Sequence, residues 1–129
     1  MKPETAERLG LEPHPEGGWF RRTWESPATV EGGRRAASLI YFLLTAGEAS
    51  AWHKVDADEI WLWHGPGSLV LEIKDDEDAP VSAHALDSEH AQVLVPAGAW
   101  QRTLPVAGEE VLASCLVSPE FLFDGFELG

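Results

Sequence analysis

The stretch that decides the fold runs from residue 47 to residue 65 and reads GEASAWHKVDADEIWLWHG. Side chains of a strand point alternately to opposite faces, so Glu59, Trp61 and Trp63 share one face of the strand predicted at Glu59–His64. Both faces are largely apolar, which predicts a strand covered on both sides. A carboxylate between two indoles must be paired or bound to a ligand. We therefore expect this face to orient a ligand or to hold a metal.

Outward from this stretch, the chain consists of short segments rich in branched and aromatic residues, with Gly, Pro and Asp at the turns between them. The first ten residues are predicted to form a short helix that ends at Gly10. The predicted strands are Trp19–Trp24, Ser38–Leu44, Ala49–Lys54, Glu59–His64, Ser68–Ile73, Val81–Leu86, Gln92–Val95, Trp100–Thr103 and Glu110–Val117. This spacing predicts an all-β antiparallel sandwich or barrel. A length of 129 residues predicts one domain, 1–129.

Composition restricts the partners and the location. The 9 Lys and Arg against 22 Asp and Glu give a net charge of −13, which argues against nucleic acid and anionic membranes as partners. A single cysteine, Cys115, forms no intramolecular disulfide, and we expect it to be a buried, inert thiol. The longest apolar run, Leu39–Leu44, is too short to span a membrane, and the first residues do not resemble a signal peptide. We expect a cytoplasmic protein; the origin of its acidity stays open.

Two motifs of this chain resemble those of the cupin superfamily. The residues in register with them are Gly47, His53, Glu59, Gly65, Pro96 and Gly98. A closer resemblance covers nearly the whole chain and is to the small, single-domain fifth cupin family, catalogued as a domain of unknown function. The segments that carry it are HPEGGWFR at 14–21, IYFLL at 40–44, WHKV at 52–55, DEIW at 58–61, VPAGAWQ at 95–101 and SPEFLFDGFEL at 118–128.

This resemblance implies a double-stranded β-helix, the jelly-roll cupin barrel, preceded by the short N-terminal helix. It also implies a homodimer with a small-molecule ligand in the mouth of each barrel. Pairing two barrels would cover the sheet edges and apolar outer faces that a small jelly roll leaves open. The family is distantly similar to deoxysugar epimerases and to small-molecule-binding cupins, and it has no settled reaction.

The metal ligands of this pattern are incomplete. Metal-binding cupins typically use three histidines and one glutamate; His53 and Glu59 occupy two of these positions, but Val55 and Gln101 stand where the other histidines would be. One imidazole, one carboxylate and one amide oxygen hold a transition metal poorly. Three hypotheses stay open: a divalent metal on His53, Glu59 and Gln101, a metal-free pocket in which His53 and Glu59 are acid/base groups, or a pair that only orders the barrel. No organic cofactor is expected.

Further candidates are ligand-binding residues. Arg21 could clamp a carboxylate or phosphate, Tyr41 could reach the pocket, and Trp61 and Trp63 could stack on a planar or sugar-like ligand. Gln101 completes this set. For each of them a purely structural role is the alternative.

Other histidines are weaker candidates. His14 lies in a Pro/Gly turn, where either a structural hydrogen bond or a place at the pocket rim is expected. His64 should point away from Glu59, and His84 and His90 should be exposed.

Three functions follow from these residues. The first is an isomerase, epimerase or lyase acting on a sugar-like or small polar substrate, with His53 as general base and Glu59 as its partner or as the acid. The second is a binding module that holds a sugar or small organic acid without turnover. The third is a metal-dependent oxygenase, which is ranked last because the motif supplies one histidine where the usual iron site needs two. Whether the protein is an enzyme, and on which substrate, is not decided by the sequence.

Overall fold

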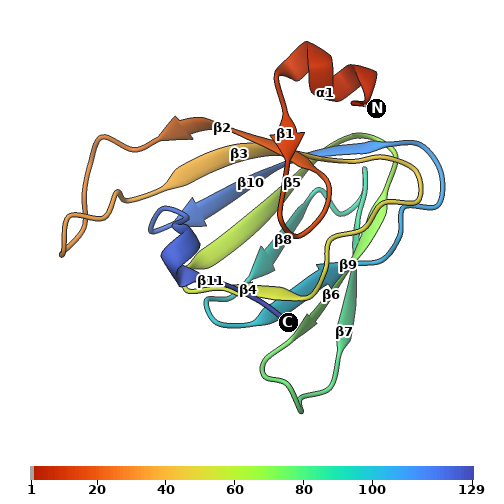
Figure 1. Ribbon diagram of the computed structural model, residues 1–129. Coiled ribbons are helices and arrows are strands. Elements are labelled where there is room, and N and C mark those ends of the chain that lie inside the picture. The colour runs from red at the N-terminus through yellow and green to blue at the C-terminus, as the bar shows by residue number, and fades with distance from the viewer. Residues whose placement is uncertain (1) are drawn as a thin grey trace.

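The computed structural model describes residues 2–129, and nearly all of its regular structure is β (Figure 1). Its elements are α1 (Glu4–Leu9), β1 (Glu12–Pro13), β2 (Trp19–Glu25), β3 (Ser38–Leu44), β4 (His53–Val55), β5 (Asp58–Pro66), β6 (Leu69–Lys74), β7 (Ser82–Leu86), β8 (Gln92–Val95), β9 (Trp100–Thr103), β10 (Val111–Ser118), the 3₁₀ turn η1 (Phe123–Gly125) and β11 (Phe126–Leu128). The predicted all-β fold is confirmed. The strand predicted at Ala49–Lys54 begins later, at His53, and β1, η1 and β11 were not predicted.

The strands form two antiparallel sheets that face each other. One sheet has the order β1-β2-β3-β10-β5-β8, and the other has the order β11-β4-β9-β6-β7. Strands that are far apart in sequence are therefore neighbours: β10 lies between β3 and β5, and β4 lies between β9 and the C-terminal strand β11 (Figure 1). This crossed order is that of a jelly-roll cupin barrel, with α1 packed outside it.

The core fills the space between the two sheets. Alternation places one apolar face of each inner strand in it, and Phe42, Trp61, Leu71 and Cys115 are almost completely buried there. The prediction that Glu59, Trp61 and Trp63 share a face agrees with this packing, because Glu59 and Trp61 are buried and Trp63 packs against the same cluster.

The turn between β1 and β2 is held tightly against the barrel. Gly17 and Gly18 both have a positive φ, 110° and 78°, which favours glycine. A Cβ on Gly17 would come within 2.3 Å of the carbonyl oxygen of Ala49, so only glycine fits this approach. The N–H of Ala51 donates to the carbonyl of Glu16 at 2.7 Å. The turn is thereby anchored beside the start of β4.

The C-terminal tail closes one end of the barrel. β11 pairs with β4, and η1 precedes it. Two arginines hold the start of the tail: Arg22 donates to the Glu120 carboxylate at 3.0 Å and to the Phe121 carbonyl at 2.5 Å, and Arg34 donates to the Glu120 carbonyl at 2.8 Å. These bonds join the tail to β2 and to the loop that follows β2.

Candidate functional site

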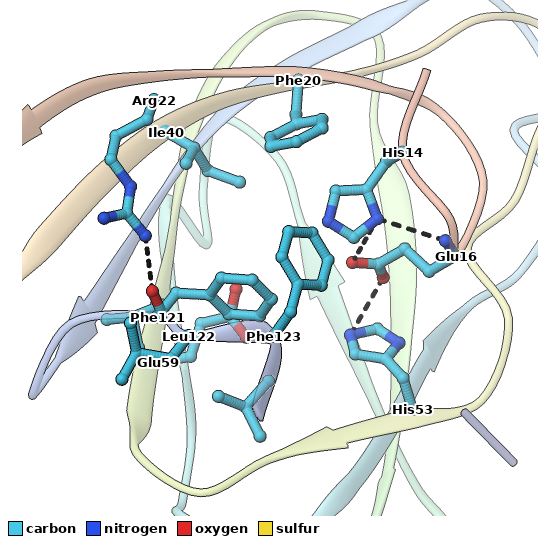
Figure 2. A pocket seen from close by; sticks show the side chains of 12 residues that line it. His14, Glu16, Phe20, Arg22, Ile40, His53, Glu59, Phe121, Leu122 and Phe123 are labelled. Carbon is cyan, nitrogen blue, oxygen red and sulfur yellow. Dashed lines mark hydrogen bonds and ion pairs between the residues drawn. The ribbon is translucent and has the colours of Figure 1, made fainter. Parts of the chain in front are cut away.

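A cavity of about 290 Å³ lies between the tail, the β1–β2 turn and the two sheets (Figure 2). Its wall is mostly apolar, with a small group of titratable side chains on one side. The lining residues are His14, Glu16, Phe20, Arg22, Ile40, His53, Val55, Glu59, Val117, Phe121, Leu122 and Phe123. A concave, mostly apolar cavity with a few converging polar groups is the usual form of a small-molecule site.

Glu16 stands between two histidines. Its carboxylate lies 2.9 Å from His53 Nε2 through one oxygen and 3.3 Å from His14 Nδ1 through the other (Figure 2). The turn anchored at Ala51 brings the carboxylate to this place, and the side chains of all three residues are buried. The sequence resemblance contained Glu16, but only the fold places it in the cavity.

His53 is held as a hydrogen-bond donor. Its Nδ1 lies 2.7 Å from the Ala51 carbonyl oxygen, which can only accept, so Nδ1 carries a proton. Burial alone would lower the pKa of His53, but the charge and polar contact of Glu16, the charge of Glu59 and the bond to Ala51 outweigh it and raise the pKa. The imidazolium form of His53 is therefore favoured next to Glu16.

His14 has the opposite charge preference. The backbone N–H of Glu16 donates to His14 Nδ1 at 3.1 Å, which places the proton of a neutral ring on Nε2. Burial lowers the pKa of His14, and the charge of His53 adds to this effect, while Glu16 opposes it. His14 is thus a neutral imidazole with its N–H on the side away from Glu16, where Phe20 and Phe123 lie (Figure 2).

Glu59 is a second, differently placed carboxyl group. Trp61 Nε1 can only donate, and it donates to Gln101 Oε1 at 3.0 Å; this turns Gln101 Nε2 toward Glu59 Oε1, at 2.8 Å. Burial raises the pKa of Glu59, against the charge of His53 and the bond from Gln101.

Burial and the nearby Glu59 also raise the pKa of the Cys115 thiol, in agreement with a buried and inert cysteine.

The site residues predicted from the sequence are distributed over four places. His53 and Glu59 line the cavity, and Gln101 and Trp61 lie directly behind Glu59 as a buried support. Trp63 packs farther along β5, where its Nε1 donates to the Gly67 carbonyl at 2.7 Å.

Arg21 and Tyr41 do not line the cavity. They are paired across β2 and β3 and face outward, where Arg21 donates to the Leu9 carbonyl at 2.8 Å and Tyr41 packs against the cluster under α1. Alternation then directs their neighbours Arg22 and Ile40 into the cavity. The sequence showed that Arg21 and Arg22 face opposite sides, but not which side is inward.

The remaining histidines lie outside the cavity. His64 is on the outer face of β5, with its Nε2 at 2.6 Å from Ser114 Oγ, and His84 and His90 are exposed. The tail residues Phe121–Phe123, in contrast, were not predicted to reach the site. The only indication in the sequence was an aromatic cluster after Pro119, and such a cluster is equally typical of a terminus that packs against the core.

The donor set does not fit a resident metal ion. Gln101 Oε1, the predicted amide ligand, already accepts from Trp61, and both ring nitrogens of His53 lie against Ala51 and Glu16. Val55 offers no donor at all. Within residues 2–129 no group of three or more His, Cys, Asp or Glu side chains is arranged to hold a metal. The polar atoms of the candidate set are therefore used in other contacts: Gln101 and Glu59 are hydrogen-bonded to each other, and His53 is held by Ala51 and Glu16.

The fold and the cavity together define a small jelly-roll barrel with a mostly apolar cavity at one end, which is the architecture of the cupins. The sequence matches the family described as Cupin superfamily (DUF985) over residues 3–129, and the chain belongs to this family. None of the described helices is long and apolar enough to cross a membrane.

Solved structures support this assignment. A protein of Shewanella oneidensis is 34% identical, with a TM-score of 0.89 over 100% of this chain and 85% of that one. A hypothetical protein from Leishmania major is 30% identical, with a TM-score of 0.84 over 96% and 84% of the two chains. No curated protein matches significantly.

More distant structures share the fold alone. The capsular polysaccharide assembling protein CapF from Staphylococcus aureus is 12% identical, with a TM-score of 0.73 over 92% of this chain and 31% of its own. Oxalate decarboxylase from Bacillus subtilis is 15% identical, with a TM-score of 0.68 over 90% and 29%.

Proposed function

We propose that the cavity binds a small molecule and moves a proton on it, as an isomerase, epimerase or lyase does. The observation that carries this proposal is the presence of two carboxyl groups in different environments within one cavity. Glu16 is paired with His53, whose pKa is raised, whereas burial raises the pKa of Glu59 and favours its neutral acid. Carboxyl groups that differ in this way are the usual pair of base and acid.

The roles follow from the contacts. The Glu16 carboxylate, supported by His53, takes a proton from a carbon beside a carbonyl group, and Glu59 gives its proton to the carbonyl oxygen. Return of the carbon-bound proton to the neighbouring carbon completes an isomerisation, and its return to the same carbon on the opposite face completes an epimerisation. In both cases a hydroxyl proton goes back to Glu59, and no co-reactant is needed. Gln101 and Trp61 are positioning residues, since they orient Glu59 and do not line the cavity.

The test is hydrogen exchange in D₂O, followed by proton NMR on a panel of neutral ketones, hydroxyketones, aldoses and keto acids. We expect exchange at the carbon beside the carbonyl for one class of this panel, and a loss of about 10²-fold or more in Glu16→Gln and in Glu59→Gln. Glu31→Gln, an exposed carboxylate outside the cavity, is the matched control. Binding without exchange above the buffer rate would instead establish a binding module.

Metal content tests the third function considered above, a metal-dependent oxygenase. If His53, Glu59 and Gln101 held one divalent ion, protein purified without a tag or chelator would contain close to one metal per chain, and His53→Ala and Glu59→Ala would lose it. The contacts that these residues already make support the opposite result, folded protein with far less than one metal per chain. Near-stoichiometric metal in the unmodified protein would overturn the metal-free mechanism.

Two copies of the chain are also proposed to associate. β1 covers only the start of β2, at Trp19 and Phe20, so the rest of that sheet edge is open, and Trp24 on it is 47% exposed. An open edge with an exposed indole is a surface that a second barrel could cover. Light scattering at the mass of one chain would contradict this homodimer.

A further inference from the structure

The cavity wall is apolar over most of its surface. Seven of its twelve residues are hydrocarbon side chains, and three of these are aromatic: Phe20, Ile40, Val55, Val117, Phe121, Leu122 and Phe123. The ring of Phe121 meets that of Phe123 edge to face at 4.9 Å between centroids, and Phe20 meets His14 in the same way at 4.5 Å. Such a wall favours an apolar ligand body over the hydroxyl-covered surface of a sugar.

The one arginine in the wall has no free charge for an anion. Arg22 donates to Glu120 at 3.0 Å, to Glu25 at 3.3 Å and to the Phe121 carbonyl. Its guanidinium is therefore compensated by two carboxylates and serves to hold the tail. A ligand carboxylate or phosphate would have to displace these contacts.

The charged groups deeper in the cavity also compensate each other. Glu16 and His53 lie 2.9 Å apart and are buried together. A charged ligand would leave water for a site without an unpaired opposite charge, which is unfavourable. The cavity therefore discriminates against ionic ligands of either sign.

Besides Glu59, two polar groups of the cavity face a neutral ligand. The Nε2–H of His14 lies on the side away from Glu16, toward Phe20 and Phe123, and is a hydrogen-bond donor (Figure 2). Glu16 Oε2 is buried beside His53 Nε2 at 2.9 Å and has no other polar partner among the described residues. A neutral donor and a carboxylate on one side of an apolar cavity match a single carbonyl group and an acidic C–H beside it.

We infer that the ligand is an uncharged, largely apolar carbonyl compound, whose oxygen accepts the hydrogen bond of His14 and whose body lies against the phenylalanine wall. This inference rests on the proposed function for its site, but it concerns recognition and stands without turnover. The volume of about 290 Å³ corresponds to about ten water molecules, so the ligand is small. Sugars and small organic acids, the alternatives that the sequence left open, are disfavoured by the same wall.

The test compares two probes of the same size and shape. Phenylacetone and phenylacetate have the same number of non-hydrogen atoms and differ in replacing an uncharged methyl ketone by a carboxylate. Binding is measured by chemical-shift titration of the full chain, with glucose as the sugar probe. We expect phenylacetone to bind at least about tenfold more tightly than either of the other two. Equal or tighter binding of phenylacetate or glucose, or no binding of phenylacetone at its solubility limit, would overturn the inference.

Variants of His14 test the hydrogen bond. His14→Phe keeps an aromatic ring but removes the donor, and we expect phenylacetone to bind about five- to tenfold more weakly. His14→Gln can accept from the Glu16 N–H and still donate, and it should retain most of the affinity. His84→Gln, an exposed histidine, is the control. A change in the ¹H and ¹⁵N chemical shifts of the His14 Nε2–H group on ligand addition provides a second readout in the unmodified protein, and unchanged shifts at saturating phenylacetone would contradict the hydrogen bond.

The two proposals fail separately. If phenylacetone binds with this selectivity but its C–H groups exchange no faster than in buffer, the inferred ligand class holds and catalysis is wrong. If exchange is seen only with charged or sugar substrates, the catalytic proposal holds and the ligand class is wrong. A His14→Phe variant with unchanged affinity would contradict the recognition role of His14 in both cases.

Discussion

The inward face of β5 is used differently at its two ends. At one end Glu59 borders a cavity, with its carboxyl group held by Gln101, and at the other end the partly buried Trp63 packs against the core beside Gly67. Trp61 lies between them and is 1% exposed. The same alternation thus produces a hollow end and a packed end within one strand. The difference arises from what the strand meets there, the polar β1–β2 turn and the tail at one end, and the closely packed core at the other.

The largest effect is expected from Trp61, because it serves both ends. Trp61→Ala removes a fully buried indole from the core and the donor that orients Gln101, and should lower the free energy of unfolding by about 3–5 kcal/mol. Urea denaturation measures this change. Leu94→Ala, at a position on β8 that is 56% exposed, should cost less than about 0.5 kcal/mol. A loss below about 1 kcal/mol for Trp61→Ala would show that this part of the barrel is not tightly packed.

The next effect concerns the ion pair at the hollow end. Glu16→Gln removes the partner of a buried imidazolium, and breaking such a pair costs about 3 kcal/mol. The raised pKa of His53 gives this cost a pH dependence. Its stabilising contribution is complete below the unfolded pKa of about 6.5 and is lost as the pH rises through the higher folded pKa.

Urea denaturation at several pH values checks this prediction. The difference between the unmodified protein and Glu16→Gln should be largest in mildly acidic solution and should decrease toward alkaline pH. Glu31→Gln should show no such trend. A constant difference over the whole range would mean that His53 does not titrate with the pair.

Glu59 should give a smaller effect of opposite sign. Its raised pKa means that its contribution to stability is present below the unfolded pKa of about 4.3 and is lost as the pH rises through the folded pKa. Glu59→Gln does not titrate, so the variant should become more stable than the unmodified protein as the pH increases, by about 1 kcal/mol. The same variant should no longer exchange the substrate's C–H protons in D₂O. Glu59 would then be a group that is retained for function at a cost in stability. A variant less stable than the unmodified protein at all pH values would contradict this prediction.

The strands could be predicted from sequence because their signal is local: the alternation in Glu59–His64 depends only on neighbouring residues and shows which side chains share a face. His53 and Glu59 were found as candidates through the resemblance of their motif to that of the cupins. The rest of the site depends on tertiary placement. Glu16 reaches His53 through a backbone bond between two loops, from Ala51 to the Glu16 carbonyl, which no periodicity encodes.

Arg21 and Arg22 show the limit of alternation. A strand pattern separates two neighbours onto opposite faces, but the inward face is set by what covers each side. Here α1 covers the outer side, where Leu9 accepts from Arg21, and the tail covers the inner side, where Phe121 accepts from Arg22. The two covering segments, α1 and the tail, lie outside β2 in the sequence. The inward side could therefore not be chosen from the pattern of the strand alone.

A substitution in the tail should give the smallest change in stability. It should also distinguish most clearly the cavity at one end of β5 from the packed core at the other. Phe123 lines the cavity but is 53% exposed, so Phe123→Ala should lower the free energy of unfolding by no more than about 1 kcal/mol. Because its ring is part of the apolar wall, the variant should nevertheless bind phenylacetone several-fold more weakly. Leu94→Ala, at a similarly exposed position on β8 outside the cavity, should leave binding unchanged. Titration and denaturation of both variants distinguish a wall that selects the ligand from a terminus that only packs: equal affinities in the two variants would assign the tail to packing alone.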